Sequence, residues 1–167
     1  MKRIGILSDT HGFLDDSIFS HFNDCDEIWH AGDIGNTDIS HRLSEFKPYK
    51  AVFGNIDDKS VRLKHPEWHL FEQENIRIVI IHIAGSIPRY TKEVQKLIEE
   101  HKLQILICGH SHILKVAPDK KNNLLYINPG AAGHHGFHKF RTILKMDLDA
   151  GQIKNMQAIE LGKRGIN

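Results

Sequence analysis

The sequence has few cysteines, no long apolar run and almost no net charge, and each absence argues against a class of protein. Cys25 and Cys108 are the only cysteines, so we expect no disulfide framework and a reducing, cytoplasmic location. The apolar stretch 4–7 ends at Ser8 and Asp9, which makes it too short for a signal-peptide core or a membrane span. With 22 basic and 21 acidic residues the net charge is +1, so charge gives no case for binding nucleic acid or a membrane surface.

No linker, repeat or low-complexity tract divides the chain, and 167 residues are the size of one domain. We therefore expect a single domain over 1–167. Short runs rich in Ile, Val and Leu predict buried strands at 2–7, 27–31, 50–53, 77–82 and 105–108. Helical periodicity between these runs predicts helices at 16–22, 38–46 and 91–101.

The remaining apolar segments predict strands joined by turns. A hairpin is expected from 68–71 and 76–81, across the polar residues 72–75. After Gly109 only strands are expected, at 114–117, 124–128, 142–148 and 152–159, and we expect them to be antiparallel. These elements predict a mixed α/β fold in which two sheets lie face to face as a β-sandwich flanked by helices.

Histidine is in excess, at 13 residues, and its positions matter more than its number. Five clusters of metal-ligand residues each follow an apolar run: Ser8-Asp9-Thr10-His11-Gly12, Gly32-Asp33, Gly54-Asn55, His82 and Gly109-His110-Ser111-His112. Proteins that mix strands and helices place their chemistry where strands give way to loops. The clusters are therefore candidates for one functional site.

Each cluster taken alone also fits a structural role. Turns or helix caps account for Asp9 and His11, for Asp33 and for Asn55, and a hydrogen-bonded core position accounts for His82. The pair His110 and His112 is the most specific, because two imidazoles two residues apart behind a buried strand serve few structural purposes.

One site with two metal ions explains all five clusters at once, and we favour it over five separate structural roles. Two divalent cations need a shared carboxylate, further ligands, and open positions for water and substrate oxygens. On an extended backbone Asp9 and His11 would share a face, so both could hold one ion. No cluster contains cysteine, which suits manganese first, then nickel, iron, cobalt or zinc, and magnesium less because of the imidazoles.

With these clusters and the turn Asn128-Pro129-Gly130-Ala131, the sequence resembles the calcineurin-like metallophosphoesterases, in particular their small bacterial and archaeal phosphodiesterases. The resemblance implies a four-layer fold, with a two-sheet sandwich between layers of helices. It also implies a ligand set: Asp9, His11 and His112 for the first metal, Asn55, His82 and His110 for the second, and Asp33 as the bridge between them.

The implied reaction is hydrolysis of a phosphoester by in-line attack of a metal-activated water or hydroxide. Three residues are expected to act in catalysis: Asp33, Asn55 and His110. Many phosphomonoesterases of this superfamily carry a histidine directly after the asparagine, where this chain has Ile56. We therefore expect phosphodiesters to be preferred over monoesters. The family also often has glycine after the residue that matches His82, where this chain has Ile83.

The segment 133–141 is cationic, aromatic and rich in glycine, and we expect it to contact the substrate. The candidate substrate-binding residues are Asn55, His134, His138 and Arg141. A solvated loop that leads into the next strand explains the segment equally well. Asp57 and Asp58 either support the Asn55 loop or are solvated turn carboxylates.

Two other functions stay open. A catalytically weak, protein-binding scaffold like the retromer subunit of this fold has degraded metal ligands, whereas all seven positions are intact here. A nuclease of the superfamily usually adds a DNA-engaging domain, which neither the length nor the charge provides. We expect a small phosphoester substrate, no membrane, no large nucleic-acid partner, and assembly as a dimer or tetramer.

Overall fold

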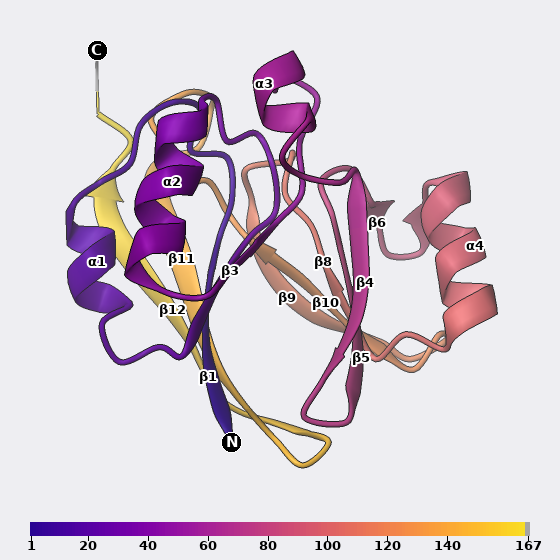
Figure 1. The fold of residues 1–167 in the computed structure, drawn as a ribbon. Coiled ribbons are helices and arrows are strands. Elements are labelled where there is room, and N and C mark those ends of the chain that lie inside the picture. The colour runs from indigo at the N-terminus through magenta and orange to yellow at the C-terminus, as the bar shows by residue number, and fades with distance from the viewer. Residues whose placement is uncertain (166–167) are drawn as a thin grey trace.

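The computed structural model describes residues 1–165 (Figure 1). The first of its two large sheets has the strand order β12-β11-β1-β2-β3. These strands are β1 (Lys2–Leu7), β2 (Glu27–His30), β3 (Tyr49–Ala51), β11 (Phe140–Asp149) and β12 (Gln152–Lys163). The first three are parallel, and β11 is antiparallel to both β1 and β12.

The second sheet has the order β4-β5-β8-β10-β9. Its strands are β4 (Trp68–Gln73), β5 (Ile76–Ile81), β8 (Ile105–Ile107), β9 (Leu114–Asp119) and β10 (Leu124–Pro129). β5, β8 and β10 are parallel, and the two edge strands are antiparallel to their neighbours. A small hairpin, β6 (Gly85–Ser86) and β7 (Arg89–Tyr90), stands apart from both sheets.

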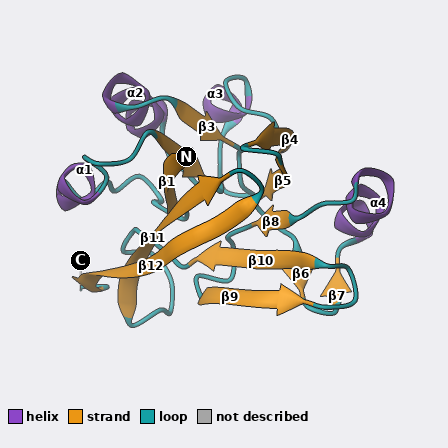
Figure 2. Ribbon diagram, turned by 90° about the horizontal axis from the view of Figure 1, so that it is seen from below, coloured by secondary structure: helices purple, strands orange, loops and turns teal. Residues whose placement is uncertain are grey.

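The helices are α1 (Ser17–His21), α2 (Thr37–Phe46), α3 (Lys59–Arg62) and α4 (Lys92–His101). α1, α2 and α4 cover the outer sides of the two sheets, whereas α3 lies at one end of the sandwich (Figures 1 and 2). α1 and α2 lie against the first sheet and α4 against the second. None of the helices in residues 1–165 is long and apolar enough to cross a membrane.

Three apolar layers hold this arrangement together. The central layer lies between the sheets and includes Ile4, Ile6 and Ile80, all fully buried. The alternation of Ile4 and Ile6 along β1 points both side chains inward, as a strand with a period of two residues requires. The outer layers lie under α1 and α2 and under α4. The expected mixed α/β fold, a two-sheet sandwich flanked by helices, is therefore confirmed.

One expectation needs correction. The strands after Gly109 are not all antiparallel, because β10 also pairs in parallel with β8. Of these strands, β9 and β10 complete the second sheet, while β11 and β12 return to the first. The short helix α3 and the β6–β7 hairpin were not expected, because four and two residues are too few to show a period.

Candidate metal centre

The five sequence clusters lie at one edge of the sandwich, because each follows a strand of a parallel group. Asp9 follows β1, Asp33 follows β2 and Asn55 follows β3, whereas His82 follows β5 and the pair His110 and His112 follows β8. Backbone hydrogen bonds join these loops. The Asp9 amide donates to the Gly32 carbonyl at 3.0 Å, and the Gly109 amide to the His82 carbonyl at 3.1 Å.

Six of the predicted ligands form two groups of three, and within each group the ligand atoms lie within 4.8 Å of one another. The groups are Asp9, His11 and His112, and Asp33, His82 and His110. Within the first, His112 Nε2 is 3.1 Å from Asp9 Oδ1. Asp33 Oδ2 lies 3.3 Å from His11 Nε2 and 3.2 Å from His82 Nε2, so this oxygen stands between the two groups.

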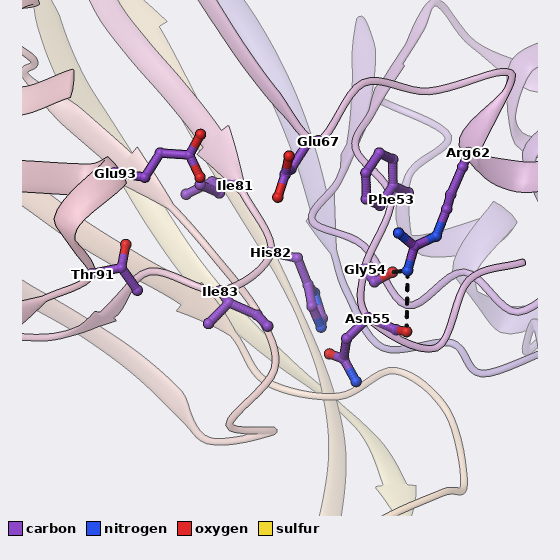
Figure 3. Close-up of a pocket in the computed structure, with 10 residues that line it drawn as sticks. All are labelled: Phe53, Gly54, Asn55, Arg62, Glu67, Ile81, His82, Ile83, Thr91 and Glu93. Carbon is purple, nitrogen blue, oxygen red and sulfur yellow. Dashed lines mark hydrogen bonds between the residues drawn. The ribbon is translucent and has the colours of Figure 1, made fainter. Parts of the chain in front are cut away.

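Asn55, the seventh predicted ligand, lies beside the second group. Its Oδ1 is 2.9 Å from His110 Nδ1. Figure 3 shows its side chain next to that of His82, at the edge of a cavity. The structure therefore brings all seven predicted residues together.

Three buried atoms at the centre have no hydrogen-bond partner within the described residues: Asp9 Oδ1, His11 Nε2 and His82 Nε2. Leaving buried polar atoms unpaired costs about 1–3 kcal/mol each. One divalent cation at each group would satisfy these atoms, Asp9 and His11 in the first group and His82 in the second, and their oxygen and nitrogen chemistry suits such ions. His82 supports this assignment, because its Nδ1 lies 2.8 Å from the Ala31 carbonyl and donates to it, which leaves the Nε2 lone pair for a metal.

Five of the seven residues have a left-handed backbone, with φ values between +46° and +69°: Asp9, His11, Asp33, His110 and His112. This conformation costs a residue other than glycine about 1–2 kcal/mol. Such strain is retained mainly at functional sites. Asp9 and His11 therefore reach the same place through this conformation, which corrects the expectation of an extended backbone.

Gly54 makes room for the carboxylate between the groups. A Cβ at this position would lie 2.1 Å from Asp33 Oδ1, so no larger residue fits without moving that carboxylate. The Ile56 amide donates to the same oxygen at 3.0 Å. The loop after β3 thus holds Asp33 in place from one side while it presents Asn55 from the other.

The carboxylates at the centre are ionised. Burial raises the pKa of Asp9 and of Asp33, but the neighbouring imidazoles outweigh burial, and both pKa values fall below the ordinary range. Burial lowers the pKa of His11, but Asp33 and Asp9 outweigh it and raise this pKa to about 9. A metal ion therefore has to displace a proton from His11.

Asp57 ties two of the ligand loops together. It is buried, and its carboxylate accepts hydrogen bonds from the amides of Ile34 (3.1 Å), Gly35 (2.7 Å) and Gly54 (2.8 Å). Its exposed neighbour Asp58 instead caps α3 by accepting from the Val61 amide at 3.2 Å. Of the two roles considered for these carboxylates, support of the Asn55 loop therefore fits Asp57.

Sequence reasoning missed Arg62, which lies on α3. Its Nε donates to the Asp57 carbonyl at 2.7 Å, and its guanidinium also reaches the Gly54 and Asn55 carbonyls (Figure 3). The ring of Phe53 lies 4.5 Å below this guanidinium. No sequence signal marked Arg62, because its role depends on the unpredicted helix α3.

The segment 133–141 lies only partly at the centre. His138 lines a cavity of about 430 Å³ over the ligands, and His134 lines the adjoining one. His138 Nε2 donates to the Gly133 carbonyl at 2.9 Å, while its buried Nδ1 has no partner within residues 1–165. His135, which was not predicted, stacks on His11 with ring centroids 4.8 Å apart.

Arg141 is a correction to the predicted substrate-binding set. Its guanidinium donates to Asp15 at 2.6 Å and to the carbonyls of Lys163 and Leu161, both at 3.2 Å. The side chain is buried by these contacts and lines neither cavity over the centre. It therefore stabilises the end of β12 rather than facing a substrate.

Oxygen and nitrogen ligands at the ends of parallel strands in a two-sheet sandwich favour a metal-dependent enzyme. The chain belongs to the calcineurin-like phosphoesterase superfamily, whose domain model matches residues 1–151. Members of this superfamily depend on divalent metal ions. The resemblance recognised in the sequence is therefore confirmed.

Two archaeal relatives support this membership. A probable metallophosphoesterase from Methanothermobacter thermautotrophicus is 33% identical over 135 residues, which cover 77% of this chain and 76% of the relative. A probable metallophosphoesterase from Methanocaldococcus jannaschii is 31% identical over 134 residues, covering 77% of this chain and 67% of the relative.

Solved structures share the fold at lower identity. An archaeal phosphodiesterase superposes with a TM-score of 0.77 at 23% identity, covering 95% of this chain and 99% of that one. Zinc-bound Vps29 from Entamoeba histolytica superposes with a TM-score of 0.72 at 14% identity, covering 98% and 99%. These similarities establish the fold alone.

Proposed function

We propose that the chain is a phosphodiesterase with two metal ions. The observation that carries this proposal is the position of Asp33, whose Oδ2 lies within 3.3 Å of one imidazole from each ligand group. A carboxylate shared by two cations is what a binuclear site requires. Manganese suits the ligands best, with nickel, iron, cobalt and zinc as alternatives and magnesium less suited.

Burial divides the seven residues by role. Asp9, Asp33 and His82 are buried and therefore hold the ions, whereas Asn55 and His110 are exposed and can also reach a bound phosphoester. When bound, two divalent ions would neutralise charge on the phosphoryl oxygens and lower the pKa of water. Asn55 and His110 would orient the phosphoryl group from the open side, and Asp33 would help to hold both ions.

The side chain of Ile56 supports a preference for phosphodiesters over phosphomonoesters. It follows Asn55 and lines the cavity over the ligands, with 45% of its surface exposed. An aliphatic side chain here can neither donate a proton to a poor leaving group nor bind the second negative charge of a monoester. A diester carries one charge, and its second ester arm gains contact with an apolar wall.

Hydrolysis of bis(p-nitrophenyl) phosphate tests the proposal, with Mn²⁺, with Ni²⁺ and after chelation. We expect turnover that needs a metal and that Asp33→Ala reduces by about a thousandfold. Asp38→Ala, an exposed aspartate on α2, is the matched control and should leave the rate unchanged. Equal rates for wild type and Asp33→Ala would show that Asp33 is not a carboxylate shared by two ions, and the proposed mechanism would then be wrong.

A protein-binding scaffold is the second candidate function, and its support is the shared fold of Vps29. We place it second because all seven ligand positions are filled by ligand-type side chains. Tight metal binding without turnover on any phosphoester would favour the scaffold. The single domain over 1–167, the cytoplasmic location and the dimer or tetramer stay predictions.

A further inference from the structure

The cavity over the ligands has an apolar side that the proposed chemistry leaves unexplained. Three large apolar side chains line it and stay exposed: Phe137 at 103% of its reference surface, Ile113 at 65% and Ile56 at 45%. The same cavity reaches His110 and Asn55. Exposed apolar groups gathered around a polar centre are typical of ligand-binding sites.

Phe137 is held at this place by its neighbours in the chain. A Cβ on Gly136 would lie 2.2 Å from His112 Nδ1, so the backbone passes directly over a metal-ligand residue at a position that needs glycine. His135 stacks on His11, and His138 is tied to the Gly133 carbonyl. The loop is therefore anchored on both sides of a phenyl ring that packs against nothing in the described fold.

The other two apolar residues are fixed relative to the ligands by the sequence itself. Ile56 directly follows Asn55, and Ile113 directly follows His112. A phosphoester held at Asn55 and His110 therefore places one of its ester arms beside these side chains. No lysine or arginine of residues 1–165 lines this cavity, which argues against an arm that carries a further phosphate.

We propose that the cavity binds an aromatic ester arm of the substrate, an aryl group or a nucleobase, against Phe137, Ile56 and Ile113. This inference rests on the proposed function and names its substrate class. A flat ring suits the site because aromatic rings stack on one another and because aliphatic side chains cover their remaining faces. Stacking also tolerates any base, since every base has a π-face.

Two phosphonates allow the contribution of the ring to affinity to be measured apart from that of the phosphoryl group. Methylphosphonate and phenylphosphonate carry the same charged head, but only the second has a ring. With the full chain loaded with Mn²⁺, we expect isothermal titration calorimetry to show phenylphosphonate binding about tenfold more tightly. Phe137→Ala should reduce this preference by about three- to tenfold without changing the Kd of methylphosphonate, while Phe137→Trp should retain it.

Phe140→Ala is the matched control, because this aromatic lies on the same segment, is 43% exposed and does not line the cavity. It should change neither Kd. The proposed aromatic arm would be wrong if phenylphosphonate bound no more tightly than methylphosphonate. It would also be wrong if butylphosphonate bound as tightly as phenylphosphonate and Phe137→Ala did not weaken that binding. Either result would leave the proposed function standing. Failure of both phosphonates to bind, together with full activity of Asp33→Ala, would overturn the proposed function itself.

Discussion

The buried ligands and the exposed residues around them are built by different means. The buried part consists of Asp9, Asp33 and His82. Each follows the end of a strand, and hydrogen bonds between the loops hold Asp9 and Asp33 in a left-handed backbone and fix the ring of His82. The exposed part contains Asn55, His110 and Phe137, whose side chains are open to solvent. The first part is organised by folding, whereas the second is free to meet a ligand.

We infer that the buried part contributes chiefly to metal binding, and that the exposed part, which adds the predicted ligands Asn55 and His110, also governs the choice of substrate. Substitutions below the ligands should change stability and metal affinity together, because the same hydrogen bonds serve both. Substitutions around the cavity should change the preference among substrates while the protein stays equally stable. The separation between the two parts is therefore open to direct measurement.

The largest effect on stability is expected from Asp57→Ala. The substitution leaves three backbone amides without their acceptor, so it should lower the free energy of unfolding by about 3 kcal/mol. It should also weaken Mn²⁺ binding, because the Asp33 and Asn55 loops lose their common tie. Chemical denaturation in chelator and calorimetric titration with Mn²⁺ measure the two effects.

Asp58→Ala is the control for this prediction. It removes the neighbouring carboxylate, which caps α3 and accepts from the Ser60 hydroxyl, and should cost about 1 kcal/mol with no change in metal affinity. If the two variants were equally stable, Asp57 would not join the loops as described.

The burial of His30 predicts that the stability of the protein depends on pH. It is fully buried at the end of β2, where its Nδ1 accepts from the Gly32 amide at 3.1 Å and its Nε2 therefore donates to Thr10 Oγ1 at 3.0 Å. Burial lowers the pKa of His30 to about 3. In the unfolded chain His30 has its ordinary pKa of about 6.5, so below this pH the unfolded chain binds a proton that the folded chain does not.

Stability from His30 is therefore complete above pH 6.5 and is lost as the pH falls from there toward 3. Between pH 7.5 and 5 the wild type should lose about 2 kcal/mol more than His30→Asn, which keeps an acceptor for Gly32 but cannot titrate. Denaturation midpoints of both proteins in chelator give the comparison, in which the effects of the other histidines cancel. Parallel pH profiles would show that His30 is not held neutral.

Much of the fold followed from the sequence because the parallel strands are short, apolar and bounded by glycine or aspartate. The hairpin of β4 and β5 was predicted with its turn, which Glu74 and Asn75 form with positive φ. The return of β11 and β12 to the first sheet was not, because their alternation is the same whichever sheet they join. Partner choice depends on contacts such as Ile4 with Met146, which are distant in sequence.

The grouping of the seven predicted ligand residues followed from the sequence because each follows a predicted strand, and parallel pairing of these strands brings their ends to one edge. The surrounding residues did not. Arg141 and His138 have the same polar character in the sequence, but one is paired with Asp15 and the other lies over the ligands. Only tertiary packing distinguishes the roles of these two side chains, and only tertiary packing reveals the role of Arg62.

The smallest expected effect concerns the choice between monoesters and diesters. Ile56→His should raise the ratio of kcat/KM for p-nitrophenyl phosphate to that for bis(p-nitrophenyl) phosphate by about fivefold, because an imidazole beside Asn55 can bind the second charge of a monoester or protonate its leaving group. Val116→His is the matched control, because this exposed aliphatic side chain lies on β9 and does not line the cavity, and it should leave the ratio unchanged. Since Ile56 is exposed, neither the unfolding free energy nor Mn²⁺ affinity should move. An unchanged ratio in Ile56→His would mean that specificity is set by the buried ligands, and the division between the two parts of the site would fail.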